Sequence, residues 1–226
     1  PIGIVTFAMT ALGAIAGGLV TLLVQGRIFG LRLAMPQALR GAVGKVQGRL
    51  LIGVINSIGV RSDAKSIETL AGKLKDADVE VVTAAAVALG QIGGTQAAKI
   101  LDQTLTAAGN ETRPGIAEGG IICAERLLAD GKFADATQLY DAVRKAQVPK
   151  QRLLEATRGA ILARQSAGIP LLMEQLRSAD KAVVGIALRT ARELRGRDVT
   201  EALGAELDRA TPERQVMLLL ALADRG

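Results

Sequence analysis

Apolar residues recur along most of the chain at intervals of three and four, which is the spacing of one face of an α-helix. Within residues 79–92, for example, Val82, Ala86 and Leu89 fall on one broad face. No run of alternating polar and apolar residues bounded by turn residues occurs, so we expect no β-strand. The pattern predicts an all-α fold.

The apolar periods and the turn residues divide most of the chain into successive helical pairs. A single pair cannot bury its apolar face alone, so neighbouring pairs must stack to form a core. The sequence therefore predicts an α-solenoid, a superhelix of antiparallel helical pairs. The predicted pairs are Pro36–Val46 with Arg49–Ile58, Lys65–Leu74 with Val79–Ile92, Gln96–Ala108 with Arg113–Ala129, Phe133–Ala146 with Lys150–Gln165, Ile169–Arg177 with Ala182–Leu194, and Val199–Arg209 with Pro212–Ala223.

Two landmarks repeat along these pairs. Ile58-Gly59 and Ile92-Gly93 are 34 residues apart, and Asp78 and Asp180 are 102 residues apart, which is three times that period. We expect each Asp to cap the free N–H groups at the start of the next helix. We expect the Gly of each Ile-Gly to adopt the left-handed conformation that ends the preceding helix.

The second landmark opens a longer motif, Asp78-x-x-Val81-Val82-x-x-Ala85-x-x-Ala88-Leu89-Gly90-x-Ile92-Gly93. This motif resembles the HEAT-repeat family, and more narrowly its short bacterial form, the PBS-lyase HEAT-like repeats. One departure is Val82, where that form usually has Arg. The resemblance covers residues 49–105 and, less closely, 166–223.

The central part of the chain departs from this pattern. It is more similar to a tetratricopeptide helix pair, with the motif Gly131-x-Phe133-x-x-Ala136-x-x-Leu139-Tyr140. Residues 48–224 are also similar to the HEAT modules of large exported planctomycete-type proteins. That resemblance implies a scaffold beside other domains or subunits, favours a periplasmic or other extracytoplasmic location, and carries over no catalytic residue.

Residues 1–26 contain no charged residue, and Arg27 is the first. The stretch is long enough to cross a bilayer as a helix and is apolar on every face. We expect it to be a separate, membrane-inserted segment preceding a solenoid of residues 27–226. A buried first layer of the solenoid and a processed signal segment are the alternatives. The candidate membrane-contact residues are Ile4, Phe7, Leu12, Leu19, Leu22 and Arg27.

The positive charge of the chain is concentrated behind this segment. Residues 27–75 hold nine basic and two acidic residues, a net charge of +7, whereas residues 76–226 have a net charge of −1. A nucleic-acid-binding solenoid would be expected to carry basic residues along its whole surface. The distribution therefore makes nucleic acid an unlikely partner. Basic residues also begin directly after many spans on their cytoplasmic side, but with one flank in view the side of the membrane stays open.

The amino-acid composition excludes most common kinds of catalytic site. The chain has no His, and Cys123 is the only Cys, so imidazole bases, thiolate zinc clusters and internal disulfides are excluded. Cys123 is expected to be a small buried core residue. The glycines of residues 115–120 do not fit the spacing of a phosphate-binding loop. We therefore predict no catalytic residue, no metal and no cofactor.

Four arginines crowd the end of the predicted helix 182–194. Arginine at a helix C-terminus is favoured by the helix dipole, which accounts for part of this cluster. The functional interpretation is a contact with an acidic partner on the concave face, joined by Arg158 of the preceding inner helix. The candidate partner-binding residues are Arg158, Arg189, Arg192 and Arg195, with Arg197 nearby.

Three classes of function follow. A non-catalytic scaffold or subunit that binds protein partners within a larger, membrane-attached complex is favoured. A nucleic-acid-binding solenoid, such as the HEAT-fold alkylpurine glycosylases, is disfavoured because base recognition uses aromatic stacking and the chain has only three Phe and one Tyr. A pigment lyase or chaperone, suggested by the name of the repeat, would lack an obvious acid–base group.

Overall fold

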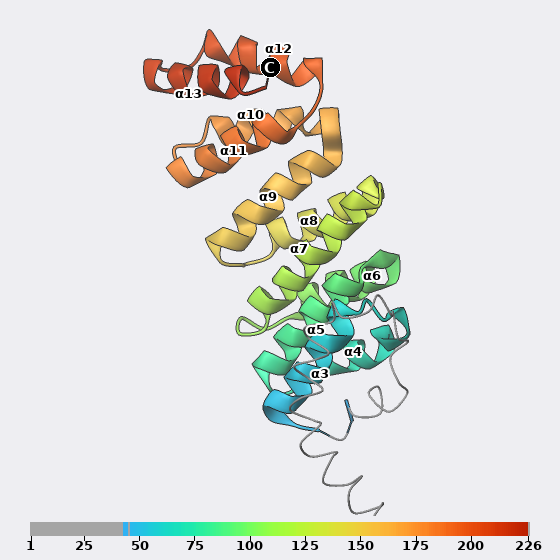
Figure 1. Ribbon diagram of the computed structural model, residues 1–226. Helices are drawn as coiled ribbons and strands as arrows, with labels where there is room; N and C mark the ends of the chain where they lie inside the picture. Colours follow the sequence, from blue (N-terminus) through green and yellow to red (C-terminus); the bar gives the residue numbers. More distant parts are fainter. Residues whose placement is uncertain (1–42, 45, 226) are drawn as a thin grey trace, which may run out of the picture.

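The computed structural model describes residues 43–44 and 46–225 (Figure 1). Throughout these residues the secondary structure is helical and no strand occurs. The α-helices are α3 (Gly48–Val60), α4 (Ile67–Lys73), α5 (Val79–Ile92), α6 (Gly94–Ala107), α7 (Arg113–Ala129), α8 (Phe133–Lys145), α9 (Lys150–Arg164), α10 (Ile169–Leu176), α11 (Lys181–Glu193), α12 (Arg197–Leu207) and α13 (Pro212–Ala223). Short 3-10 helices, Ala64–Ser66 and Gln165–Gly168, precede α4 and α10. The predicted all-α class is confirmed.

The helices stack as a single row of pairs from α3 to α13 (Figure 1). Each of α5, α7, α9, α11 and α13 contacts the preceding helix of that series, so that α3, α5, α7, α9, α11 and α13 form one layer. The paired helices α4, α6, α8, α10 and α12 lie beside them. This arrangement is the predicted stack of helical pairs, with element boundaries within a few residues of those expected.

Local capping explains where several helices begin and end. The Asp78 carboxylate accepts a hydrogen bond from the N–H of Glu80 at 2.9 Å, and Asp180 accepts one from Ala182 at 2.9 Å, as predicted. Gly93 has φ 72° at the end of α5, also as predicted. The expectation for Gly59 is wrong, because α3 continues to Val60 and the positive φ falls on Ser62 instead.

Gly59 is instead needed for close packing between helices. A Cβ on Gly59 would lie 2.8 Å from the Cα of Ala88 on α5. The same applies where α5 crosses α7, because a Cβ on Gly90 would lie 2.3 Å from the carbonyl oxygen of Gly119. Glycines let two helix backbones approach more closely than larger residues allow. Gly115 of α7 is packed in the same way, because a Cβ there would lie 2.2 Å from the hydroxyl oxygen of Thr83 on α5.

The buried side chains form two clusters, one running from Val43 to Ala163 and the other from Ile161 to Ala221. They are dominated by Ala, Leu, Ile and Val, and Tyr140 is the largest fully buried side chain among them. The two clusters meet on α9. Cys123 lies in the first cluster and is fully buried, which confirms its expected place in the core.

The expected N-terminal segment lies outside the residues that the structure describes. This applies to Ile4, Phe7, Leu12, Leu19, Leu22 and Arg27, to the boundary between residues 26 and 27, and to most of the predicted helix 36–46. Within residues 43–44 and 46–225, no helix is both long enough and apolar enough to cross a membrane.

Candidate partner-binding surface

The predicted arginines on α9 and α11 are engaged in ion pairs. Arg158 donates to Glu193, and Arg189 Nε lies 3.2 Å from the other carboxylate oxygen of Glu193. Arg192 Nε lies 2.6 Å from Asp224 Oδ2, which follows α13. The structure thus brings Arg158 and Arg189 together through one shared carboxylate, and it leaves little uncompensated charge on this face.

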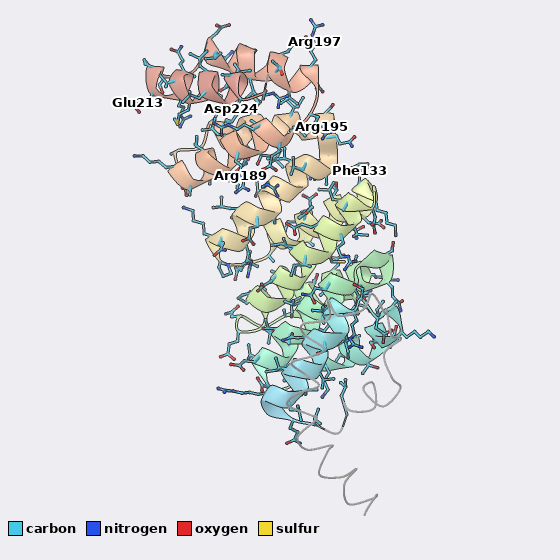
Figure 2. All side chains as sticks on the ribbon, in the orientation of Figure 1. Phe133, Arg189, Arg195, Arg197, Glu213 and Asp224 are labelled. Carbon is cyan, nitrogen blue, oxygen red and sulfur yellow. The ribbon has the colours of Figure 1, made fainter. Side chains whose placement is uncertain are left out.

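The other two arginines of the cluster lie elsewhere. Arg195 is exposed at the turn between α11 and α12, with no hydrogen bond or ion pair to any part of the chain that the structure describes (Figure 2). Arg197 begins α12 and pairs with Glu201 at 2.9 Å. Sequence proximity therefore does not produce one cationic patch, because the turn separates these side chains and acidic neighbours neutralise all but Arg195.

A second candidate surface, formed by exposed aliphatic side chains, lies on α13. Val216 and Leu220 are each 58% exposed, and Leu219 is 54% exposed, whereas Leu218 and Ala221 on the opposite side are buried. Large aliphatic side chains are rarely exposed as a contiguous group in a monomeric protein, and such groups mark interaction sites. The helical spacing of these residues places them together on the side of α13 that faces away from the core.

This surface is not among the predicted site residues. Its signal was present as Val216-Met217-Leu218-Leu219-Leu220, five consecutive apolar residues inside a helix. A helix that packs on one side only should alternate apolar and polar faces, so an unbroken run predicts that a second side is covered as well. The corresponding side of α11 is covered by α13.

Cys123 lies in the core on α7 and is not part of this surface. Burial raises the pKa of the Cys123 thiol to about 12, against a smaller opposing effect of Arg126. A thiol in that state is protonated and unreactive at neutral pH. Among the described residues, no three His, Cys, Asp or Glu side chains gather as metal ligands would.

Comparison with known proteins gives a family match for one segment of the chain. Residues 46–118 match the family model described as HEAT repeats, which confirms the HEAT-repeat prediction for that segment. No curated protein gives a significant sequence match.

The solved structures that are similar to the chain include an engineered protein, a lyase complex and a hydroxylase. An engineered protein from a structural genomics consortium has 19% identity and a TM-score of 0.48, covering 83% of this chain and 95% of its own. The CpcE–CpcF complex of phycocyanin lyase from Nostoc sp. has 17% identity and a TM-score of 0.41, covering 95% and 83%. Human deoxyhypusine hydroxylase in complex with glycerol has 15% identity and a TM-score of 0.34, covering 96% and 99%.

Proposed function

Taking residues 46–118 as HEAT repeats, we propose that the chain is a non-catalytic scaffold that binds a helical segment of another protein. The exposed aliphatic face of α13, formed by Val216, Leu219 and Leu220, carries this proposal. Covering this face would remove apolar surface from water, which is the main favourable term in most protein association. No bound metal or reactive side chain is required for such a role.

The stacking of the solenoid supports a helix as the occupant. Each helix of the layer from α3 to α11 is covered by the next helix of that layer. A helix laid on α13 would repeat that contact, with its own apolar side meeting Val216, Leu219 and Leu220. Binding of an amphipathic helix in an apolar groove is a common mode of peptide recognition.

The test combines a double variant with crosslinking at a defined position. Val216→Glu with Leu220→Glu should abolish co-purification of the partner, because two charges would be buried at the contact. Val60→Glu is the matched control, since Val60 is 67% exposed at the end of α3 and far from α13. A photo-crosslinking residue at position 219 should link to the same partner. Retention of every partner by the double variant would refute the proposal.

The size of the particle distinguishes a partner from a second copy. Light scattering of the purified chain should report a monomer if the occupant is a different protein. A dimer that dissociates in the Val216→Glu, Leu220→Glu variant would instead identify the occupant as another copy of this chain. Circular dichroism should be the same for both proteins, because the substituted side chains are exposed.

The predicted arginines enter the proposal as a secondary, electrostatic contact. Arg195 is the best single probe, because its reversal to Glu breaks no interaction within the described chain. Arg189→Glu with Arg192→Glu tests the other predicted residues, but it also disrupts the pairs with Glu193 and Asp224. Charge reversals that leave partner binding and its salt dependence unchanged would remove these arginines from the interface.

Membrane attachment through residues 1–26 remains part of the proposal and rests on the sequence alone. The observation is an uncharged stretch followed by the +7 segment from Arg27 to Lys75. Chain that stays in the pellet after an alkaline carbonate wash of native membranes would support it. Full release into the aqueous fraction would overturn it, while leaving the scaffold role of α13 untouched.

A further inference from the structure

A small cavity lies between the last two helical pairs of the solenoid. Its volume is about 200 Å³, and α10, α11, α12 and α13 all contribute to it. The aliphatic residues that line it include Leu176, Val184, Leu188, Met217 and Leu218. The interior of the cavity is therefore apolar, and it lies on the side of α13 that faces α11.

The size of the cavity restricts what it can hold. Small-molecule and cofactor sites usually measure about 300–1,000 Å³, so this cavity is smaller than a typical cofactor site. A single large aliphatic side chain is a better match for an apolar space of this volume. The cavity thus has the dimensions of an anchor pocket for one residue of a peptide.

Three arginines and one glutamate line the same cavity. Arg177 donates from Nε and Nη2 to the two carboxylate oxygens of Glu206, at 2.9 and 2.6 Å. Arg214 donates from Nη1 and Nη2 to the carbonyl oxygens of Leu176 and Ser178, at 3.3 and 2.6 Å. Arg209 is exposed, and its guanidinium makes no hydrogen bond or ion pair with any residue placed by the structure.

These contacts indicate whether a ligand of the cavity would be anionic or cationic. Glu206 is neutralised by the bidentate contact with Arg177. The hydrogen-bond partners of Arg214 are neutral carbonyl groups, and the Arg209 guanidinium forms no ion pair, although both arginines also help to lower the pKa of Glu206. With three arginines and one glutamate, the cavity lining has a net charge of +2. A cationic ligand would have to displace Arg177 from Glu206, whereas an anionic ligand would meet Arg209 and Arg214 directly.

We infer that this cavity binds an acidic peptide segment by one aliphatic side chain, with a neighbouring carboxylate on Arg209 and Arg214. The aliphatic side chain supplies burial, and the charge-assisted hydrogen bonds supply orientation. The inference rests on the proposed scaffold role only in taking the ligand to be a protein segment. It names a second contact point, next to the α13 face and separate from it.

The binding test uses a purified chain and a synthetic peptide. The probe is a fluorescein-labelled peptide with a central leucine between two glutamates, measured by fluorescence anisotropy. Replacing the glutamates by glutamines, or the leucine by serine, should each weaken binding. Added salt should weaken the interaction, because one component is electrostatic. Equal binding of all three peptides would overturn the inference.

Two arginine variants locate the contact. Arg209→Gln should reduce affinity about two- to fivefold, the effect expected for one exposed ion pair. Arg49→Gln is the matched control, because Arg49 on α3 is also exposed but does not line the cavity. Affinity lost in Arg49→Gln and retained in Arg209→Gln would place the peptide elsewhere and contradict the inference.

A methionine in the cavity offers a direct readout. The chain contains four Met residues, of which Met217 lines the cavity, so methyl labelling gives few resonances. The Met217 methyl signal, assigned with the Met217→Leu variant, should shift on addition of the acidic peptide. An unchanged signal at saturation would refute the cavity as the site. Partner capture through Val216 and Leu220 would remain intact in that case, so the two proposals fail separately.

Discussion

Gly119 of α7 lies directly against Ala86 of α5, so closely that a Cβ on Gly119 would sit 2.2 Å from the Ala86 carbonyl oxygen. The neighbouring atom belongs to the backbone and cannot rotate away. This contact sets how closely helices α5 and α7 of adjacent repeats approach each other.

Gly119→Ala should destabilise the fold by about 1–3 kcal/mol, because the added methyl group forces α5 and α7 apart. Gly185→Ala on α11 is the matched control, since nothing lies within 4 Å of its Cβ position. There the change should be neutral or stabilising by up to about 1 kcal/mol, because Ala favours the helix more than Gly does. Urea unfolding followed by circular dichroism measures both. Equal effects at the two positions would show that the close crossing is absent.

The stability of the C-terminal repeats should depend on the ionisation of Glu206. The hydrogen bonds from Arg177 hold the pKa of Glu206 below its ordinary value of 4.5, and burial opposes this only in part. A lowered pKa means that the carboxylate stabilises the fold fully above about pH 4.5, and that this contribution is lost as the pH falls through the lowered pKa.

Glu206→Gln should therefore be less stable than the natural chain at neutral pH and lose less stability on acidification below pH 4.5. Free energies of unfolding measured across that interval should converge for the two proteins. Parallel curves would mean that the carboxylate contributes no pH-dependent term.

Cys123 should be inert in the folded protein. It is fully buried, and its raised pKa of about 12 leaves almost no thiolate near pH 8. Labelling with a thiol reagent should be slow in buffer and complete in concentrated urea. A Cys123→Ser, Glu125→Cys protein provides the comparison, because position 125 is exposed on the same helix and should react at once. Comparable rates for both native proteins would argue against a buried Cys123.

Arg126 should stabilise the junction of three consecutive repeats. From α7 it donates to the hydroxyl of Ser62 at 3.0 Å, and also to the carbonyl oxygen of Gln91 at the end of α5. Arg126→Ala should cost about 1 kcal/mol of stability, the typical contribution of such hydrogen bonds. Arg197→Ala removes an exposed arginine with only a same-helix partner and should change stability by less than about 0.5 kcal/mol. A similar loss in both would assign no special role to Arg126.

Much of the fold could be predicted because its determinants are local. The Asp78 and Asp180 caps, the Gly93 turn and the three-to-four spacing of aliphatic residues each act within one or two helical turns. Gly59 shows the limit of such reasoning. Its dipeptide Ile58-Gly59 has the same residues as the Ile-Gly that ends α5, but it lies inside α3. Only the contact of Gly59 with Ala88 explains why Gly is needed there.

The candidate site could be predicted from the sequence less well than the fold. Arg189, Arg192 and Arg195 are close in sequence. Arg189 and Arg192 are nevertheless ion-paired with Glu193 and Asp224, so their charges are compensated. The residues of the cavity show the opposite case. Arg177, Arg209 and Arg214 are spread over neighbouring elements, and the stacking of the last two pairs brings them together.

The sequence by itself thus determined the helices and the repeat, because capping and helical periodicity depend on residues close together in the chain. It also excluded chemistry that needs histidine, because the composition contains none. Which surfaces stay exposed depends on how the pairs stack. Val216, Leu219 and Leu220 have the same apolar character as the core residues around them, and packing alone leaves them uncovered. Arg177 is ion-paired with Glu206 of another helix, whereas the guanidinium of Arg209, three residues from Glu206, forms no ion pair. Exposure and charge pairing are properties of long-range contacts, which residue order alone does not contain.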